Sequence, residues 1–214
     1  MCRNGQYTER GIKQIDGFMS ERWRIEPEYT MWVDRSLGLL GVLLEPTTVV
    51  TKGWEQVVAI GQRAFWEPQT VLVTGAGPIG LLAALLSVQH NLEVHVLDQI
   101  GSGPKPELVR ALGATYHTGT VAGVGFEPDV IIECTGVGQV IADSVRTVGA
   151  GGIVCLTGGG SAGPAPALPT ADVAAAVLKN EAIVGSVNAN RRHWYKAGAA
   201  LARADRTWLA RLVT

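Results

Sequence analysis

The chain has 214 residues, of which 47% are hydrophobic and 17% are charged, and its formal net charge is −1. This composition provides a substantial apolar core and excludes an intrinsically disordered chain. The small net charge excludes an electrostatic nucleic-acid or membrane-surface binder, and the longest apolar stretch, residues 79–88, is too short to span a bilayer. The three cysteines, Cys2, Cys134 and Cys155, are widely spaced and indicate no disulfide framework. We therefore expect a reducing, cytoplasmic setting without nucleic-acid or membrane partners.

The first third of the chain lacks the pattern of a self-contained domain. Short strand-like segments at residues 17–24 and 29–33 precede a helix for which Thr47 or Thr48 is the expected N-cap. The apolar face of that helix is formed by Val49, Val50, Trp54, Val57 and Val58. We predict that residues 1–63 are the remnant of another domain with a connecting helix, and that residues 64–214 form a domain of their own. The chain is then expected to be a fragment of a longer protein.

From residue 69 onward, short apolar strands alternate with helices. Strands are expected at residues 71–74, 93–98, 129–134, 152–157 and 182–187. Helices are expected at residues 78–90, 106–112, 139–148, 170–179 (with Thr170 as cap) and 192–204. This alternation predicts an α/β domain with a doubly wound parallel sheet.

A glycine-rich segment follows the first of these strands directly and opens a helix. Its sequence, Gly75-Ala76-Gly77-Pro78-Ile79-Gly80, matches the pattern G-x-G-x-x-G. In a Rossmann domain the first glycine makes the tight turn, the second admits a pyrophosphate, and the third packs the helix on the strand. Asp98 ends the next strand, 18 residues after Gly80, where a ribose-binding carboxylate is expected. The motif predicts dinucleotide binding; the alternative is a plain strand–helix turn with a solvated aspartate.

The residues around Asp98 bear on the choice between NAD and NADP. A carboxylate there accepts a hydrogen bond from the ribose 2′-hydroxyl but repels a 2′-phosphate. Gln99 follows it and no arginine is adjacent, while Lys105 lies close enough in sequence to reach a phosphate. We expect NAD, with NADP as the alternative.

Several short segments carry a resemblance to a known family. They are Met1–Gly5, Tyr7–Gly11, Gly17–Glu21, Arg24–Glu28, Leu43–Thr47, Gly103–Glu107 and Val187–His193. Together they cover nearly the whole chain, and it resembles the archaeal-type glucose 1-dehydrogenases of the medium-chain (zinc-type) dehydrogenase/reductase superfamily. The resemblance implies that residues 1–63 are the remnant of a GroES-like catalytic domain, and that most of this domain and a C-terminal tail are missing.

The resemblance also implies an activity. The full-length enzyme would transfer hydride from C1 of an aldose, chiefly D-glucose, to NAD or NADP and yield the lactone, with a catalytic zinc as Lewis acid. It would be a homo-oligomer. The main zinc ligands would lie outside this chain, so the fragment alone is expected to be poorly active. Cys2 matches one cysteine of a structural zinc site, but a lone cysteine cannot build a tetrahedral site, and we expect none.

The resemblance assigns roles to individual residues. Glu45 matches the acidic residue at the zinc and substrate, Glu9 a carboxylate that binds sugar hydroxyls, and Asn188 an asparagine beside the nicotinamide and substrate. Without it, Glu9 reads as a surface-loop carboxylate, Glu45 as a helix N-terminal acid and Asn188 as a turn residue. By the same pattern, the residues expected to face the cofactor after two later strands are Thr135, Gly136, Leu156, Thr157 and Gly158; the alternative is that they simply end the strands.

Two other functions remain open on sequence alone. One is a dehydrogenase of the same superfamily that acts on another alcohol or polyol. The other is a non-enzymatic dinucleotide-sensing module, because Rossmann domains also serve as regulators.

Overall fold

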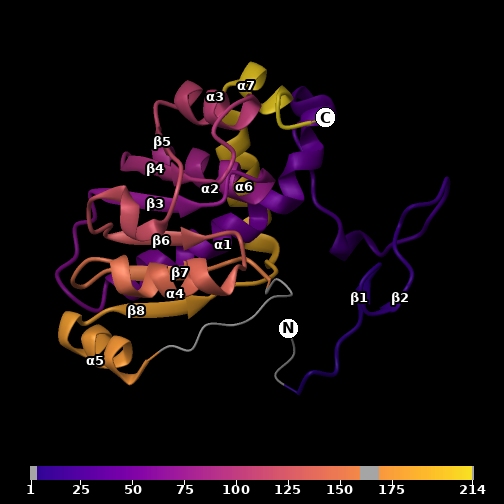
Figure 1. The fold of residues 1–214 in the computed structure, drawn as a ribbon. Helices are drawn as coiled ribbons and strands as arrows, with labels where there is room; N and C mark the ends of the chain where they lie inside the picture. The colour runs from indigo at the N-terminus through magenta and orange to yellow at the C-terminus, as the bar shows by residue number, and fades with distance from the viewer. Residues whose placement is uncertain (1–3, 160–168, 214) are drawn as a thin grey trace. The chain divides into compact units, whose positions relative to one another are not determined.

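Six parallel strands form the central sheet of the computed structural model, which describes residues 4–159 and 169–213. Their order is β5-β4-β3-β6-β7-β8, so the chain begins in the middle, runs to one edge, returns and runs to the other (Figure 1). The reversal places the topological switch point between β3 and β6, where such sheets bind ligands beyond the strands' carboxyl ends. The predicted doubly wound sheet is confirmed.

The elements of the sheet and its helices follow the expected alternation. The strands are β3 (Thr70–Thr74), β4 (Glu93–Leu97), β5 (Thr115–His117), β6 (Val130–Glu133), β7 (Ile153–Leu156) and β8 (Ala182–Gly185). The helices are α1 (Leu44–Gly61), α2 (Pro78–Gln89), α3 (Pro104–Ala111), α4 (Gly138–Thr147), α5 (Thr170–Lys179), α6 (Arg191–Arg203) and α7 (Arg206–Ala210), with 3-10 segments η1 (Pro27–Tyr29), η2 (Arg35–Leu43) and η3 (Val121–Val124). All five expected strands and all five expected helices after residue 69 are present. Strand β5 was not expected, because its Thr-Tyr-His sequence has no apolar run.

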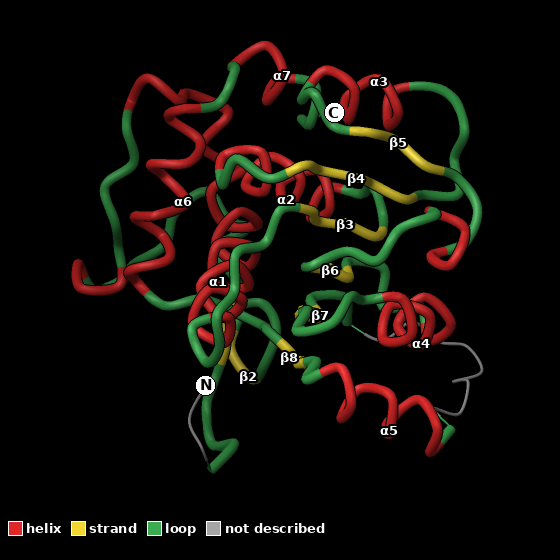
Figure 2. Tube along the Cα trace, turned by 90° about the vertical axis from the view of Figure 1, so that its left-hand side faces the viewer, coloured by secondary structure: helices red, strands yellow, loops and turns green. Residues whose placement is uncertain are grey.

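Helices cover both faces of the sheet. Figure 2 shows α1, α2 and α6 on one side and α4 on the other. The core on the α4 side is built by fully buried residues from three strands, Leu72, Ile131 and Val154, packed with residues of η3 and α4. Both faces are therefore apolar, as a parallel sheet requires. Among the described residues no helix is long and apolar enough to cross a membrane.

The chain divides into two compact units, Met1–Asp34 and Arg35–Thr214. In the first unit the paired strands are β1 (Glu9–Arg10) and β2 (Gln14–Ile15). The strands expected at residues 17–24 and 29–33 are wrong: the first segment forms bends and loop, and η1 followed by loop occupies the second. Both segments are rich in exposed residues, and without a partner strand their backbone has no ladder to join.

Two expected helix caps are also wrong. Helix α1 begins at Leu44, and within it the Thr47 hydroxyl donates to the Leu43 carbonyl at 2.6 Å, while the Thr48 hydroxyl donates to the Glu45 carbonyl at 2.7 Å. Thr170 is the first residue of α5 rather than its cap, a position that Pro169 holds. Threonine hydroxyls serve both purposes, since they bond to a carbonyl one turn back as readily as to an N–H group ahead.

The apolar face predicted for α1 is confirmed in its centre. Val50, Trp54 and Val57 are buried, whereas Val58 is 38% exposed. This face packs against α2 and α6, so α1 belongs structurally to the second unit.

Candidate functional site

The glycine-rich turn joins β3 to α2, and each glycine has a distinct environment. Gly75 adopts a φ of +88°, which strains any residue with a Cβ atom. A Cβ on Gly80 would lie 1.7 Å from the Gly75 carbonyl oxygen, so the helix packs directly on the turn. At Gly77, the residue before α2, a Cβ would meet no atom within 4 Å. The helix end therefore offers free N–H groups beside an open surface, which suits a phosphate.

Asp98 follows β4 and reaches this turn. Its Oδ2 accepts a hydrogen bond of 2.7 Å from the Ala76 N–H and forms an ion pair of 2.8 Å with Lys105 Nζ. Its Oδ1 accepts a hydrogen bond of 3.0 Å from the Ile100 N–H. Burial alone would raise the pKa of Asp98, but these hydrogen bonds together outweigh it, so the pKa is lowered. The carboxylate is charged at neutral pH and lies beside the glycine turn, as the spacing predicted.

A cavity of about 340 Å³ brings these parts together. Its lining includes Gly75, Asp98 and Lys105 together with Thr135 from the loop after β6. Its volume is at the lower end of the range for small-molecule sites and suits one nucleoside portion of a dinucleotide. A larger cavity of about 550 Å³ lies between α1, α2 and α6, around Trp54, but its lining residues come from the helices behind the sheet and not from the glycine turn.

A fully buried glutamate that was not among the expected site residues organises the loop after β6. Glu133, the last residue of β6, accepts hydrogen bonds from the N–H groups of Thr135 at 2.7 Å and Gly136 at 3.1 Å, and from the Thr135 hydroxyl. It also accepts from the Thr74 hydroxyl at 3.3 Å, next to the glycine turn. One side chain thus joins the two loops that flank the switch point. A charge inside the apolar run Val-Ile-Ile-Glu was the available signal.

The loop after β7 packs against this one through its backbone. The N–H groups of Thr157 and Gly158 both donate to the Glu133 carbonyl, at 2.8 and 3.1 Å. A Cβ on Gly158 would lie 2.2 Å from the Gly136 nitrogen, so only glycine permits this approach. These contacts place the loops after β6 and β7 side by side. Of the five residues expected to face the cofactor, Thr135 lines the cavity beside Asp98, Gly136 is buried, and Leu156, Thr157 and Gly158 are half-buried.

Asn188 lies at the same edge of the sheet, beyond β8. The Ser186 N–H donates to the Leu156 carbonyl at 2.9 Å, which places the start of this turn beside the end of β7. Asn188 is half-buried and has a φ of +60°, a left-handed conformation that asparagine tolerates better than most residues. The Ser186 hydroxyl is buried and has no hydrogen-bond partner in the described part of the chain.

The two acidic candidates lie in different units. Glu45 is exposed in the first turn of α1, and Glu9 is half-buried in β1 of the first unit. Within residues 4–159 and 169–213, no three histidine, cysteine or acidic side chains gather in a group that could hold a metal ion. Cys2 lies outside the described residues. Burial raises the pKa of Cys134 and of Cys155 to about 12, so both are unreactive thiols at neutral pH.

Comparison with known proteins identifies the family. Residues 38–214 match the family model described as "Glucose dehydrogenase C-terminus". The chain is 35% identical to a glucose 1-dehydrogenase of Methanocella arvoryzae, over 97% of this chain and 60% of that protein. It is 36% identical to glucose 1-dehydrogenase 2 of Vulcanisaeta moutnovskia, over 100% of this chain and 63% of that protein. The chain thus spans about 60% of the length of these relatives.

Solved structures agree with the sequence relatives. The crystal structure of glucose dehydrogenase from Haloferax mediterranei superposes with a TM-score of 0.92 at 30% identity, over 100% of this chain and 63% of that one. A structure of that enzyme in complex with NADP, Zn and gluconolactone gives a TM-score of 0.90 at 29% identity over the same shares of both chains. The family match over residues 38–214 and the identity to full-length relatives agree with the glycine turn and its aspartate. The chain therefore belongs to the glucose 1-dehydrogenase family of zinc-type medium-chain dehydrogenases.

Proposed function

We propose that the protein containing this chain oxidises C1 of an aldose, chiefly D-glucose, to the lactone and passes the hydride to NAD or NADP. The family carries this proposal, because the relatives are named glucose 1-dehydrogenases and a structure of a related glucose dehydrogenase is a complex with NADP, Zn and gluconolactone. The observation in this chain that supports it is the hydrogen bond from Ala76 to Asp98 beside the open surface at Gly77.

We propose that the dinucleotide lies across the carboxyl edge of the sheet. Its pyrophosphate would contact the glycine turn and the start of α2, and Asp98 would accept a hydrogen bond from the adenosine ribose. When bound, the dinucleotide supplies the hydride acceptor. The residues proposed to hold it are Gly75, Gly77, Pro78, Ile79, Gly80, Asp98, Thr135, Gly136, Leu156, Thr157, Gly158 and Asn188.

NAD is the proposed first cofactor and NADP the second. The ionised Asp98 disfavours a 2′-phosphate, but Lys105 lies 2.8 Å from this carboxylate and is 35% exposed. Its ammonium group could leave Asp98 for a phosphate without burial of a new charge. The relative with bound NADP makes this second choice a real one.

For the substrate end of the site we propose three residues: Glu45 at the zinc, Glu9 at sugar hydroxyls and Asn188 beside the nicotinamide. The described residues do not by themselves fit a zinc ion, since Glu45 is exposed and no metal-binding group surrounds it. Zinc needs three protein ligands in a catalytic site. The further ligands would come from the remainder of a catalytic domain, of which residues 1–63 would hold the remnant, with α1 as the helix that connects it to the sheet.

The proposed function is tested in two steps. NADH fluorescence and calorimetry on the 214-residue polypeptide should reveal dinucleotide binding, while its glucose oxidation should be very weak. The gene extended upstream should then encode an enzyme that oxidises glucose faster than sorbitol, threonine or a simple alcohol. Absence of NADH binding would overturn the site. Efficient glucose oxidation by the 214-residue polypeptide would overturn the zinc assignment, and dinucleotide binding without turnover by the extended protein would favour a sensing module.

We also propose that the full-length protein is a cytoplasmic homo-oligomer. The edge strand β8 and the neighbouring α5 support association, because Val177 and Leu178 are 72% and 83% exposed on α5 and Ile183 is 48% exposed on β8. Light scattering on the full-length protein should give a multiple of the monomer mass. A monomer at micromolar concentration would contradict this part of the proposal.

A further inference from the structure

We propose that Lys52 and Glu55 of α1 are positioning residues that hold the turn at residues 186–190 and thereby orient Asn188. The inference rests on the proposed function, because it takes Asn188 to lie beside the nicotinamide. It extends that function to two residues on the helix that runs behind the sheet. Neither touches the cofactor in this proposal, and both act through the backbone of the turn.

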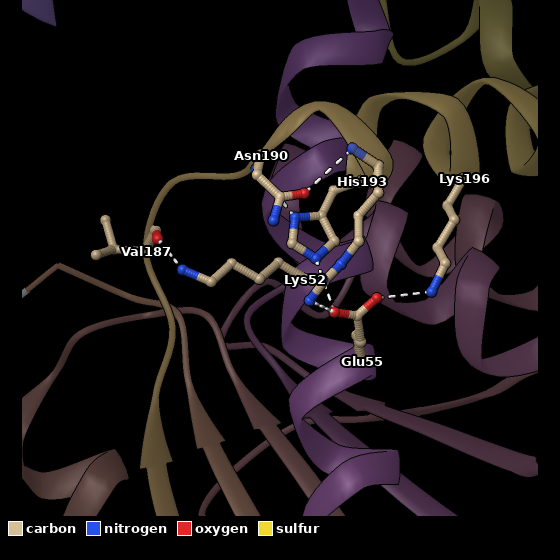
Figure 3. Close-up of polar contacts among 7 residues, drawn as sticks. Lys52, Glu55, Val187, Asn190, His193 and Lys196 are labelled. Atoms are coloured by element: carbon tan, nitrogen blue, oxygen red, sulfur yellow. Dashed lines mark hydrogen bonds and ion pairs between the residues drawn. The ribbon is translucent and has the colours of Figure 1, made fainter. Parts of the chain in front are cut away.

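Lys52 binds the backbone of the turn immediately before Asn188. Its Nζ donates a hydrogen bond of 2.7 Å to the carbonyl oxygen of Val187 (Figure 3). The Val187 side chain is 53% exposed, so side-chain packing holds this residue only in part. A hydrogen bond from a charged donor is stronger and shorter than a neutral one. Lys52 therefore fixes the peptide that joins Val187 to Asn188.

Glu55 holds the other end of the turn, at the start of α6. Its carboxylate accepts from Lys196 Nζ at 2.6 Å, from His193 Nε2 at 3.2 Å and from the Arg192 guanidinium (Figure 3). His193 is 1% exposed, and its Nδ1 accepts a hydrogen bond of 3.0 Å from the Asn190 N–H. Because a backbone N–H can only donate, Nδ1 carries no proton and Nε2–H donates to Glu55. The histidine thus links Glu55 to the cap of α6.

The start of α6 needs this support. Arg191 and Arg192 occupy its first turn, where the positive end of the helix dipole disfavours cations. Glu55 supplies a negative charge from the neighbouring helix, and the Asn190 side chain accepts from the Arg192 N–H at 3.1 Å. Between these anchors Asn188 has its left-handed φ of +60°, a conformation that asparagine tolerates and that the contacts on either side hold in place.

The same helix also carries Glu45. Lys52 lies seven residues after Glu45 on α1, which is two turns along one face and about 10 Å at 1.5 Å per residue. A rigid helix therefore sets the position of the proposed zinc-site carboxylate and, through Lys52, the position of Asn188. We infer that α1 sets the distance between the substrate end of the site, at Glu45, and the nicotinamide end, at Asn188.

The test compares two ligands that differ in the nicotinamide. Lys52→Met should weaken NADH binding by about three- to tenfold, the loss expected when one charge-assisted hydrogen bond no longer orders the turn. Binding of ADP-ribose, which lacks nicotinamide, should stay within about twofold of wild type. The fluorescence enhancement of bound NADH should also fall, and Lys52→Arg, which keeps a charged donor, should restore much of it. Glu55→Gln should give a smaller change in the same direction.

A matched control is Lys179→Met. Lys179 Nζ also donates to a backbone carbonyl, that of Val148 at 3.1 Å, but it lies where α5 ends and β8 is about to begin, at the amino edge of the sheet. The Lys179→Met substitution should change the affinity for neither NADH nor ADP-ribose. If Lys52→Met weakens both ligands equally or neither, the positioning role is wrong even though the dinucleotide site stands. If wild type binds neither ligand, the proposed function fails. If Lys52→Met does not fold, Lys52→Gln takes its place with the same expectations.

Discussion

The carboxylate of Asp98 accepts a 2.7 Å hydrogen bond from the N–H of Ala76, which joins the end of β4 to the glycine turn after β3. This contact within the protein fixes the spacing between the acid and the turn. A dinucleotide that spans the two would meet groups whose positions the protein itself sets. Such preorganisation lowers the entropy that binding must overcome.

Substitution of the two glycines that flank the start of α2 should separate binding from folding. Gly77→Ala should fold with unchanged stability, because its Cβ meets open space, yet weaken NADH binding at least tenfold because the methyl group would meet the pyrophosphate. Gly80→Ala should instead lower the melting temperature, since its Cβ would lie 1.7 Å from the Gly75 carbonyl oxygen. Calorimetry and thermal melts measure both. Unchanged NADH affinity in Gly77→Ala would contradict the phosphate position.

Substitution of Asp98 and Lys105 should move cofactor preference in opposite directions. Asp98→Asn should weaken NADH binding by about tenfold, the value of one charged hydrogen bond, and affect NADPH less. Lys105→Met should weaken NADPH binding and leave NADH nearly unchanged, since the ammonium group is the partner expected for the 2′-phosphate. Dissociation constants for both cofactors are the measurement. If Lys105→Met weakened the binding of NADH and NADPH equally, this lysine would act only on Asp98.

Removal of the Glu133 carboxylate should destabilise the domain strongly. Glu133→Ala removes the acceptor of the half-buried Thr135 N–H group and of the buried Gly136 N–H group, at a cost of about 1–3 kcal/mol each. Glu133→Gln keeps the shape of the side chain and one acceptor oxygen, so its free energy of unfolding should fall less than that of the alanine variant. Urea unfolding gives the free energies. An alanine variant within about 0.5 kcal/mol of wild type would show that the loop does not depend on this side chain.

Acid should weaken the link between α1 and α6 through Glu55. The hydrogen bond from Lys196 is the largest of the contributions that lower the pKa of Glu55 from 4.5 to about 2. Because the folded-state pKa lies below the unfolded one, ionised Glu55 stabilises the fold above pH 4.5, and this contribution disappears as the pH falls toward 2. Melting temperatures across that window should therefore fall less steeply in Glu55→Gln than in wild type.

The matched control for this titration is Glu107→Gln. Glu107 pairs with Arg211 at 2.9 Å, but its side chain is 63% exposed, so the pair contributes little. The melting temperature of Glu107→Gln should depend on pH in the same way as that of wild type. A Glu55→Gln profile that also follows wild type would contradict the role of the Glu55 cluster in stability.

The sheet and its glycine turn were predictable because their signals are local. Each apolar strand ends in a glycine or a polar residue or is followed directly by one, and the turn, the helix start and Asp98 fall within one βαβ unit. The strand β5 was not predictable by the same means. Its residues carry no apolar pattern, and only its pairing with β4 makes it a strand.

The network around Asn188 depends on contacts that no local pattern encodes. Lys52 and Val187 are 135 residues apart, and the partners of Glu55 come from α6 at the far end of the chain. The contact between Glu133 and Thr74 likewise joins residues that are 59 positions apart. In the first unit, exposed residues gave strand-like patterns without a partner strand, and the prediction there was wrong.

The position of α1 has a consequence for how the domain is made. This helix precedes the first strand of the sheet, yet it packs against α6, which is among the last elements of the chain. During synthesis, the apolar face around Trp54 emerges long before the surface that covers it. Contacts of such high sequence separation slow folding. Release of nascent chains shortened before residue 191 should therefore give protease-sensitive, aggregation-prone products, whereas chains that include α6 should resist digestion.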